Sequence, residues 1–372
     1  MRVAIGSYLL DGERCGMQIA LKDMLDGLSR SGHSRDIHLI HTKPFSDQSF
    51  ISFNDVLVSR GTVPGAGLWW SQVAVPNRIR KLPVDVLWWP YQILPPIRCA
   101  VPRVISVWDL APMSFRDNNW NRLSVTVKYR WILSLALKNA AHVICHSRAI
   151  ADEAMQRFRL PAKLISVVYP GLSESFRKAM DSRVPVDPDG HILYIGTCTP
   201  RKNVKLLIDA YKRLADGGIQ NCLALVIGGP KGARAELLAY ARRIGIPVDR
   251  LLVPEPVGVS ELIEVYRHAA VFAFPSLYEG FGLPLIEALA SGLPVVALNR
   301  STMPEVLGQS GVLVSEANPQ SFADGVRAGL RIARERATEV SETARAQAAQ
   351  FKWDEAIEST VSILRRAAEG SR

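Results

Sequence analysis

Cysteine is scarce in this chain of 372 residues. The five cysteines are Cys15, Cys99, Cys145, Cys198 and Cys222, and no two of them form a C-x-x-C pair. An odd number at irregular spacing indicates free thiols, which are typical of a reducing compartment. We therefore expect no disulfide framework and a cytoplasmic protein.

Long hydrophobic runs are also missing. The longest candidate, WILSLAL, is bounded by Arg130 and Lys138 and falls short of the roughly 18 residues that a membrane-spanning helix needs. The N-terminal run MRVAIGSYLL is interrupted by Asp11 and precedes no small-residue cleavage site, so we interpret it as a first strand rather than a signal peptide. The sequence predicts a cytoplasmic protein, with peripheral contact at the inner face of the cytoplasmic membrane as the alternative.

Acidic residues are fewer than basic ones: the chain has 35 Asp and Glu and 45 Lys and Arg, which gives a net charge of +10. Such a balance favours anionic partners, namely nucleic acid, acidic lipid or phosphorylated substrates. No motif that reads RNA or DNA is present, so nucleic acid is not the expected partner. The alternative is a basic protein whose charge serves solubility alone.

Short β-branched runs alternate with longer amphipathic segments along the whole chain. This alternation predicts strands and helices from 2 to 171. The same pattern starts again at HILYIGT (191–197), after a charged, proline-rich stretch at 178–189 that we predict to be a linker. Apolar strands separated by helices are typical of parallel α/β sheets. We predict an α/β fold with two doubly wound, Rossmann-like domains, 1–180 and 186–352, that face a central cleft, and a last helix (353–372) that packs back on the first domain.

The segment SLYEGFGLPLIEALASG (276–292) carries the first chemical signal. Gly280 and Gly282 let backbone amides approach a ligand, and the helix that begins near Pro284 adds a partial positive charge. This combination binds phosphate, and Glu279 and Glu287 can accept hydrogen bonds from sugar hydroxyls on either side of it. A nucleotide sugar fits such a loop. The alternative is a helix whose glutamates face solvent.

The second signal is YIGTCTPRKN (194–203), where Arg201 and Lys202 follow a predicted strand that ends at Gly196. Two cations at the carboxyl end of a strand suit a diphosphate leaving group, because Arg offers a planar fork and Lys a point charge. No metal or other cofactor is then needed to neutralise the phosphates. The alternative is an exposed basic turn at a helix start.

Both segments resemble those of retaining nucleotide-sugar glycosyltransferases of the GT-B fold, and in particular glycosyltransferase family four. YEGFGLPLIE has that superfamily's E-x7-E pattern, YIGTCTPRKN is similar to its Y-x-G-x-x-x-P-R-K-N segment, and ASGLPVVALNRSTMPEVLGQSGVLVSEANP is similar to the run that follows. The resemblance covers most of 190–355. The first half matches more loosely, through WWPYQILPP, SVWDLAP and the GERCG loop.

The resemblance implies a role for each matching residue. Glu279 would contact the donor hexose, Glu287 the nucleotide ribose, and Arg201 and Lys202 the diphosphate. The remaining donor contacts would come from Gly16, Gly196, Gly280, Phe281, Gly282, Leu283, Pro254 and Val257. Pro254 and Val257 lie in VPEPVG (253–258), where the family recognises the base.

One departure concerns the end of a strand in the first half. The family usually has His-Asp there, and this chain has Trp108 and Asp109. Asp109 keeps its position, so we expect it to contact the acceptor or a donor hydroxyl. The missing histidine leaves a catalytically inactive relative as an alternative.

Seven of the eight tryptophans lie between residues 69 and 131, close to the basic segment NRIRKL (77–82). Aromatic and cationic side chains together favour a membrane interface with anionic head groups. The alternative is that these tryptophans pack in a core. A membrane contact would give access to a glycan carried on a polyprenyl diphosphate.

The resemblance implies retaining transfer of a hexose, with mannose from GDP-mannose as the expected donor, in bacterial surface or exopolysaccharide synthesis. A UDP-sugar-dependent enzyme of the same fold is the first alternative. A non-hydrolysing sugar-nucleotide epimerase would lack the E-x7-E and PRKN segments. A non-catalytic module that binds nucleotide sugars or other anions would leave Glu279 dispensable.

Overall fold

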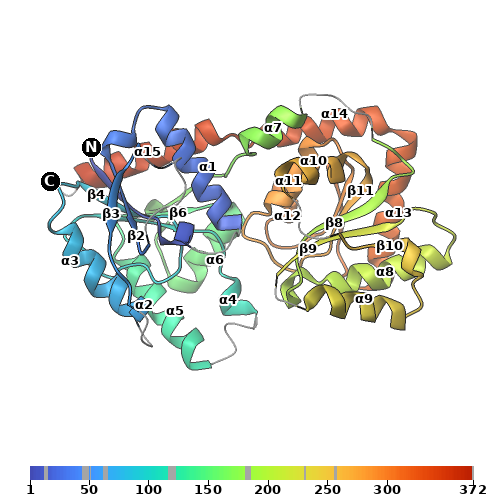
Figure 1. Cartoon of the computed structure of the whole chain (residues 1–372), viewed down its shortest axis with the longest axis horizontal. Coiled ribbons are helices and arrows are strands. Elements are labelled where there is room, and N and C mark those ends of the chain that lie inside the picture. The colour runs from blue at the N-terminus through green and yellow to red at the C-terminus, as the bar shows by residue number, and fades with distance from the viewer. Residues whose placement is uncertain are drawn as a thin grey trace. The chain divides into compact units, whose positions relative to one another are not determined.

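The computed structural model describes residues 1–11, 16–43, 50, 52–61, 66–115, 123–180, 186–229, 232–254 and 258–370. The chain folds into two compact units (Figure 1). Unit 1 contains Met1–Ser114, Asn118–Gly171 and Lys352–Arg372, and unit 2 contains Phe115–Asp117 and Leu172–Phe351.

The boundary between the two units lies earlier in the chain than the predicted position, 180. The chain enters unit 2 at Leu172, because the helix α7 (Glu174–Met180) already packs there. Its Phe176 ring meets the Tyr266 ring edge-on, with 5.3 Å between the centroids. The predicted linker at 178–189 overlaps this helix, and part of it (181–185) lies outside the described residues.

Unit 1 is built on a parallel sheet of seven strands in the order β3-β2-β1-β4-β5-β6-β7. The strands are β1 (Val3–Gly6), β2 (Ile37–His41), β3 (Asn54–Leu57), β4 (Val86–Trp89), β5 (Arg103–Val107), β6 (His142–Cys145) and β7 (Ile165–Val167). The central strands are buried on both faces, which explains their uninterrupted apolar sequence.

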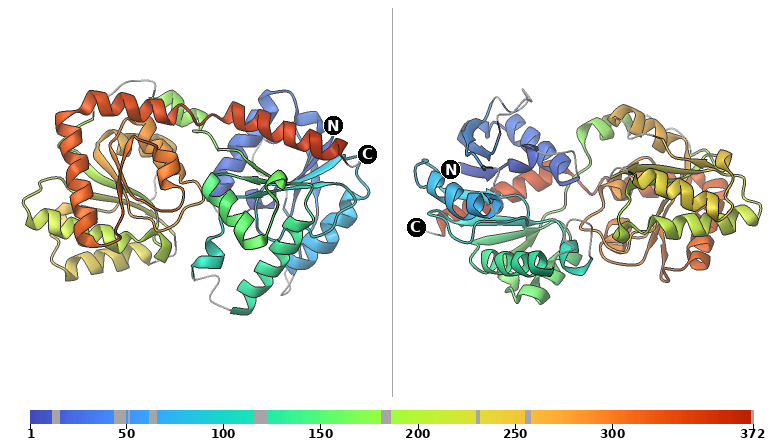
Figure 2. Two further views of the ribbon diagram at one scale, coloured as in Figure 1. Left: turned by 180° about the vertical axis from the view of Figure 1, so that it is seen from behind. Right: turned by 60° about the horizontal axis from the view of Figure 1, so that its bottom comes forward.

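Helices cover both faces of this sheet (Figures 1 and 2). They are α1 (Gly16–Arg30), α2 (Ala66–Trp69), a π-helical turn (Trp70–Ala74), α3 (Val75–Ile79), α4 (Ala111–Ser114), α5 (Leu123–Lys138), α6 (Arg148–Phe158) and α15 (Trp353–Glu369). The predicted cap is present, since the Ser147 hydroxyl accepts a hydrogen bond from the Ile150 amide at 3.2 Å. The last helix, α15, packs on α1 and on β4–β6.

Unit 2 repeats the plan with six parallel strands in the order β10-β9-β8-β11-β12-β13. The strands are β8 (His191–Thr197), β9 (Leu223–Gly228), β10 (Leu251–Leu252), β11 (Ala269–Phe274), β12 (Val295–Leu298) and β13 (Gly311–Val314). The helices besides α7 are α8 (Val204–Asp216), α9 (Ala233–Arg243), α10 (Val259–Arg267), α11 (Leu283–Ala290), α12 (Met303–Leu307), α13 (Pro319–Glu335) and α14 (Ala337–Ala348).

The strand order of unit 2 places a topological switch between β8 and β11. The chain leaves β8 toward β9 on one side and leaves β11 toward β12 on the other, so the following helices, α8 and α11, lie on opposite faces of the sheet (Figure 1). A crevice opens at the carboxyl ends of such strands, and ligands of doubly wound sheets bind there. Two Rossmann-like α/β domains are therefore confirmed, and the switch marks where a ligand site is to be sought.

Candidate functional site

Two loops meet at the carboxyl ends of β8 and β11. The first contains a short 3-10 helix, Pro200–Lys202, and the second runs from 275 to 282. The amide of Leu277 donates a hydrogen bond to the carbonyl of Arg201 at 2.8 Å. This bond ties the two loops together, so the PRKN and E-x7-E segments form one site although about 80 residues separate them along the chain.

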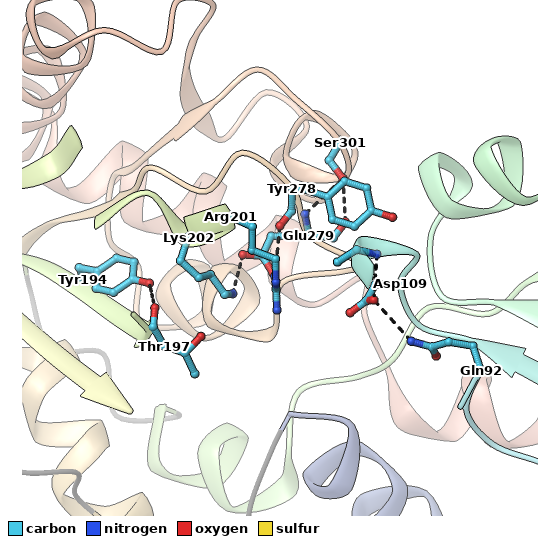
Figure 3. Close-up of polar contacts among 10 residues, drawn as sticks. Gln92, Asp109, Tyr194, Thr197, Arg201, Lys202, Tyr278, Glu279 and Ser301 are labelled. Atoms are coloured by element: carbon cyan, nitrogen blue, oxygen red, sulfur yellow. Dashed lines mark hydrogen bonds and ion pairs between the residues drawn. The ribbon is translucent and has the colours of Figure 1, made fainter. Parts of the chain in front are cut away.

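Glu279 lies between the two cations of the first loop (Figure 3). Lys202 Nζ is 2.5 Å from Glu279 Oε1, and Arg201 Nη1 is 3.3 Å from Oε2. Glu279 and Lys202 are both buried, and the Lys202 ammonium also lies 5.3 Å from the centre of the Phe274 ring. The cluster carries a net charge of +1 at neutral pH.

The electrostatics of this cluster keep Glu279 ionised. Burial alone would raise the pKa of the Glu279 carboxyl, but the nearby charges of Lys202 and Arg201 outweigh burial and hold that pKa below its usual value. The sequence predicted a sugar contact for Glu279 and a separate phosphate contact for the cations. In the free protein the three side chains are in direct contact.

The backbone of Glu279 is fixed from a third loop, the one that follows β12. Ser301 Oγ donates to the carbonyl of Glu279 at 2.7 Å and accepts from its amide at 3.3 Å (Figure 3). Ser301 itself has φ +51°, an uncommon conformation for a residue with a side chain. A two-way clamp of this kind sets the direction in which the Glu279 side chain leaves the loop.

The glycine-rich turn leads directly into α11. Gly282 has φ +90° and precedes the first helical residue, Leu283. A Cβ on Gly282 would lie 2.9 Å from Leu285 Cδ1, so the conformation requires glycine. Gly280 is buried beside it, and the ring of Phe281 packs edge-on against Phe351 at 5.3 Å. Phe281 therefore anchors the turn through its side chain.

Glu287 lies one turn further along α11. Its Oε2 accepts a hydrogen bond from the Tyr266 hydroxyl at 2.8 Å. Tyr266 is fully buried on α10, and burial together with the Glu287 charge raises the pKa of its hydroxyl well above the usual value. The hydroxyl thus stays protonated and holds the Glu287 carboxylate in place.

The other predicted donor contacts have different surroundings. A Cβ on Gly196 would lie 2.5 Å from the Tyr194 hydroxyl, which donates to the carbonyl of Thr197 at 3.0 Å. Glycine is therefore needed here for internal packing. Pro254 follows β10, two strands away from β8, and Val257 lies outside the described residues.

In unit 1, Asp109 lies at the carboxyl end of β5. Its Oδ1 accepts from the Ala111 amide at 3.1 Å and from Gln92 Nε2 at 3.4 Å (Figure 3). The carboxylate thus caps α4, and the buried Gln92 links it to the loop after β4. Gln92 Oε1 also accepts from the Trp108 amide at 3.1 Å.

Trp108 occupies the position where a histidine was expected. Its ring stacks on the His146 ring with 3.6 Å between centroids, and its Nε1 donates to the carbonyl of Pro90 at 2.8 Å. His146 is buried, donates from Nδ1 to the carbonyl of Val168, and has its pKa lowered to about 4 by burial. A neutral imidazole therefore supports the indole.

Gly16 is the first residue of α1 and is exposed, rather than part of the preceding loop. A Cβ at this position would meet no atom within 4 Å. The fold alone does not require glycine there. The preceding residues, Gly12 to Cys15, lie outside the described part of the chain.

Comparison with known proteins gives a match in each half. Residues 15–176 match the family described as Glycosyltransferase Family 4, and residues 176–347 match Glycosyl transferases group 1. Together the two profiles match 15–347, which is most of the chain. The chain belongs to the group 1 glycosyltransferases of the family 4 type.

Similar proteins differ in what their names say they act on. The D-inositol 3-phosphate glycosyltransferase of Streptomyces bingchenggensis is 32% identical over 63% of this chain and 54% of its own length. The O-antigen chain mannosyltransferase B of Escherichia coli is 35% identical over 47% of this chain and 46% of its own length. The chain thus aligns with about half the length of these curated relatives.

Among solved structures, Anabaena HepE in complex with UDP has a TM-score of 0.72 at 18% identity, with 98% of this chain and all of that chain covered. A likeness at this identity shows the fold, which is GT-B. It says nothing by itself about the donor that this member of the family uses.

Sequence reasoning missed three residues that hold the site together, namely Ser301, Tyr266 and Gln92. Ser301 lies inside the quoted run ALNRSTMPEVL, so a signal for it existed, but its partner is 22 residues away. Gln92 lies inside the quoted segment WWPYQILPP, but its partner Asp109 is 17 residues away. Tyr266 stands in a segment with no recognisable motif. No helix among the described residues is long and apolar enough to cross a membrane.

Proposed function

We propose that this protein is a retaining glycosyltransferase that transfers a hexose from a nucleoside diphosphate sugar. The observation that carries the proposal is the buried contact of Glu279 with Lys202 and Arg201 at the carboxyl ends of β8 and β11. Desolvation offsets much of the attraction in such a buried pair, so stability alone is a weak reason for it, and buried ionisable groups with shifted pKa values cluster at functional sites.

The charge balance suits a diphosphate leaving group. In the free protein Glu279 neutralises part of the charge of Lys202 and Arg201, and the bound diphosphate would take over that task. The acceptor hydroxyl attacks the anomeric carbon from the face on which the bond to the diphosphate breaks. The bonding electron pair goes to the leaving phosphate oxygen, which also takes the acceptor proton. Glu279 is then available to a hydroxyl of the hexose.

The other roles follow the same arrangement. Glu287, held by Tyr266, accepts hydrogen bonds from the ribose, and the backbone of Gly280, Gly282 and Leu283 lies along the sugar and phosphates. For Asp109 the proposed contact is the acceptor or a donor hydroxyl, and for Gly16 it is the β-phosphate. The chemistry of these groups requires no metal ion or organic cofactor.

For the donor we propose GDP-mannose. The PRKN and E-x7-E segments and the relatives whose names describe O-antigen chain mannosyltransferases support this assignment. A UDP-sugar is the second candidate, because a fold neighbour was solved with UDP-glucose. For the acceptor we propose a glycan on a polyprenyl diphosphate, in bacterial surface or exopolysaccharide synthesis.

The first test is thermal stability against GDP-mannose, GDP, UDP-glucose, UDP-N-acetylglucosamine and UDP. A ligand at a hundred times its Kd adds about 2.7 kcal/mol to the free energy of unfolding. We expect the guanine compounds alone to raise the melting temperature. A shift with the uridine compounds alone would refute the mannose assignment and leave the fold and chemistry intact. No shift with any of them would leave either an inactive relative or a donor outside this panel.

The second test is metal dependence. We expect release of GDP from GDP-mannose in the presence of acceptor to survive EDTA, because Lys202 and Arg201 supply the charge that a metal would otherwise provide. Complete loss of turnover, restored by magnesium or manganese, would overturn the metal-free mechanism.

A further inference from the structure

The positive charge of the protein is concentrated in one of its two units. Unit 1 contains 24 Lys and Arg against 15 Asp and Glu, a net charge of +9, whereas unit 2 contains 21 against 20, a net charge of +1. The stretch 51–150 alone has twelve Lys and Arg and four Asp and Glu. The excess positive charge of unit 1 therefore attracts an anionic partner to this unit rather than to unit 2.

The helix α5 combines this charge with exposed apolar side chains. Val127 and Trp131 are 57% and 63% exposed, and their i,i+4 spacing places them on the same helix face. Lys128 and Arg130 flank this pair, and Lys138 lies two turns beyond it; all three are exposed. The helix Leu123–Lys138 contains no Asp or Glu. We call this set the α5 face.

The α5 face is not explained by packing within unit 1. The opposite side of the helix supplies the core contacts, through buried residues such as Tyr129, Leu133 and Leu137. Within the described residues, no carboxylate forms an ion pair with a cation of the α5 face. A tryptophan left largely in water beside unpaired cations indicates a partner that takes up both.

A second segment of unit 1 has the same composition. Leu68, Trp69 and Val73 are exposed on α2 and the π-helical turn, and Arg78 and Lys81 follow on α3 and just after it. Trp70, in contrast, is buried and donates from Nε1 to the carbonyl of Val58. Figure 1 draws α2 and α5 along the lower edge of unit 1.

We propose that the α5 face, supported by the exposed side chains of α2, docks this protein on a bilayer that contains anionic phospholipid. Tryptophan is favoured at the level of the head groups, where its ring is in apolar contact and its N–H is hydrated. Lys and Arg beside it interact with anionic head groups. A nucleic acid duplex would use the cations but leave Val127 and Trp131 in water, because its bases are stacked on one another and not on the protein. The proposal is independent of the donor and of glycosyl transfer.

The test is co-sedimentation of the full chain with phosphatidylcholine vesicles, with and without phosphatidylglycerol. We expect binding only with phosphatidylglycerol, and weaker binding as salt is added. The double variant Lys128→Gln, Arg130→Gln should lower the partition coefficient by roughly 30-fold at low salt, from about 5-fold for each cation lost near an anionic surface. Trp131→Ser should lower it several-fold.

Two exposed residues of unit 2 give matched controls. Arg331→Gln removes a cation from α13, and Val248→Ser removes an exposed apolar side chain; both should bind vesicles as the wild type does. Equal binding of all variants, equal binding to neutral vesicles, or no binding by the wild type would overturn the proposal. Binding of a duplex oligonucleotide instead, lost in the Lys128, Arg130 variant, would assign the surface to nucleic acid and would also overturn it.

Discussion

At the scale of single residues, Glu279 has two roles that compete for the same carboxylate. As a buried carboxylate it compensates Lys202 and Arg201 in the free protein, and as a proposed sugar ligand it must remain available when the donor binds. Removal of one partner from a buried ion pair leaves the other charge uncompensated, which costs about 3–5 kcal/mol. The residue is therefore coupled to both stability and transfer.

We predict that Glu279→Gln lowers the free energy of unfolding by several kcal/mol, in the range of about 3–5 kcal/mol for a broken buried pair. The same variant should abolish transfer but retain or tighten its affinity for GDP, because both cations become available to the diphosphate. Urea unfolding and GDP titration measure the two effects. Glu236→Gln, which removes the exposed partner of Lys205, is the control and should change stability by less than about 1 kcal/mol. Unchanged turnover in Glu279→Gln would refute the assignment.

The Arg201→Ala variant separates phosphate binding from sugar orientation. Arg201 Nη1 also donates to the carbonyl of Tyr278 at 3.2 Å, so this side chain connects the two loops as well as the charges. We expect weaker GDP binding and a loss of about 3–4 kcal/mol of transition-state stabilisation, by analogy with removal of an oxyanion-hole donor. Calorimetric titration with GDP is the measurement, and equal affinity would place the phosphates elsewhere.

His146 predicts a pH dependence of stability. Its folded pKa of about 4 lies below the value of about 6.5 for an unfolded histidine. The unfolded chain therefore binds the extra proton as pH falls between these values, and the folded protein loses about 3 kcal/mol from neutral pH to about pH 4. Burial and the neighbouring Asp26 raise the pKa of Asp23 to about 6, which acts in the opposite direction.

The variant His146→Gln isolates this contribution, because an amide can still donate to the carbonyl of Val168 and does not titrate. We expect its free energy of unfolding to decline less than that of the wild type as pH falls. Parallel pH profiles of the two proteins would show that folding leaves the pKa of His146 unchanged.

At the scale of elements, the start of α11 depends on a backbone conformation and not on a side chain. Gly282→Ala should cost about 1–3 kcal/mol, because alanine would adopt φ +90° and its Cβ would press on Leu285. The expected loss of transfer follows from displacement of the turn that carries Glu279. Thermal unfolding and a transfer assay measure both effects.

Gly16→Ala is the matched control at the start of α1. Its Cβ would meet no atom, so stability should stay within about 1 kcal/mol. If the proposed phosphate contact of Gly16 is correct, transfer falls while stability holds. A variant with wild-type kcat and KM would remove Gly16 from the site.

At the scale of the whole molecule, the chain crosses between its units more than once. The helix α15 follows unit 2 in sequence but belongs to unit 1. Its Ile357 side chain is buried and packs closely against Gly27 on α1. Ile357→Ala should cost about 2–5 kcal/mol in unit 1, and GDP binding should persist because the residues proposed to bind the diphosphate, Arg201 and Lys202, belong to unit 2. Calorimetry with and without GDP tests this, and loss of GDP binding in a folded variant would contradict it.

Much of the fold follows from the sequence. Strands such as β4 and β5 were recognisable as apolar runs, because a strand covered on both faces contains few polar residues. The long helices α1, α5 and α15 were recognisable by their periodicity and their ends. The edge strand β3 was not, since three of its four residues are exposed and its sequence NDVL has no core pattern.

The sequence by itself determined the two α/β domains, the family and the pair of loops that carry Arg201, Lys202, Glu279 and Glu287, because motif residues are close together along the chain. Only the tertiary structure decided that Glu279 contacts both cations, that Ser301 and Tyr266 hold the two glutamates, and which tryptophans are exposed. These features join residues from different strands and loops. Their positions depend on the order of strands in the sheet and on burial, which no local pattern encodes.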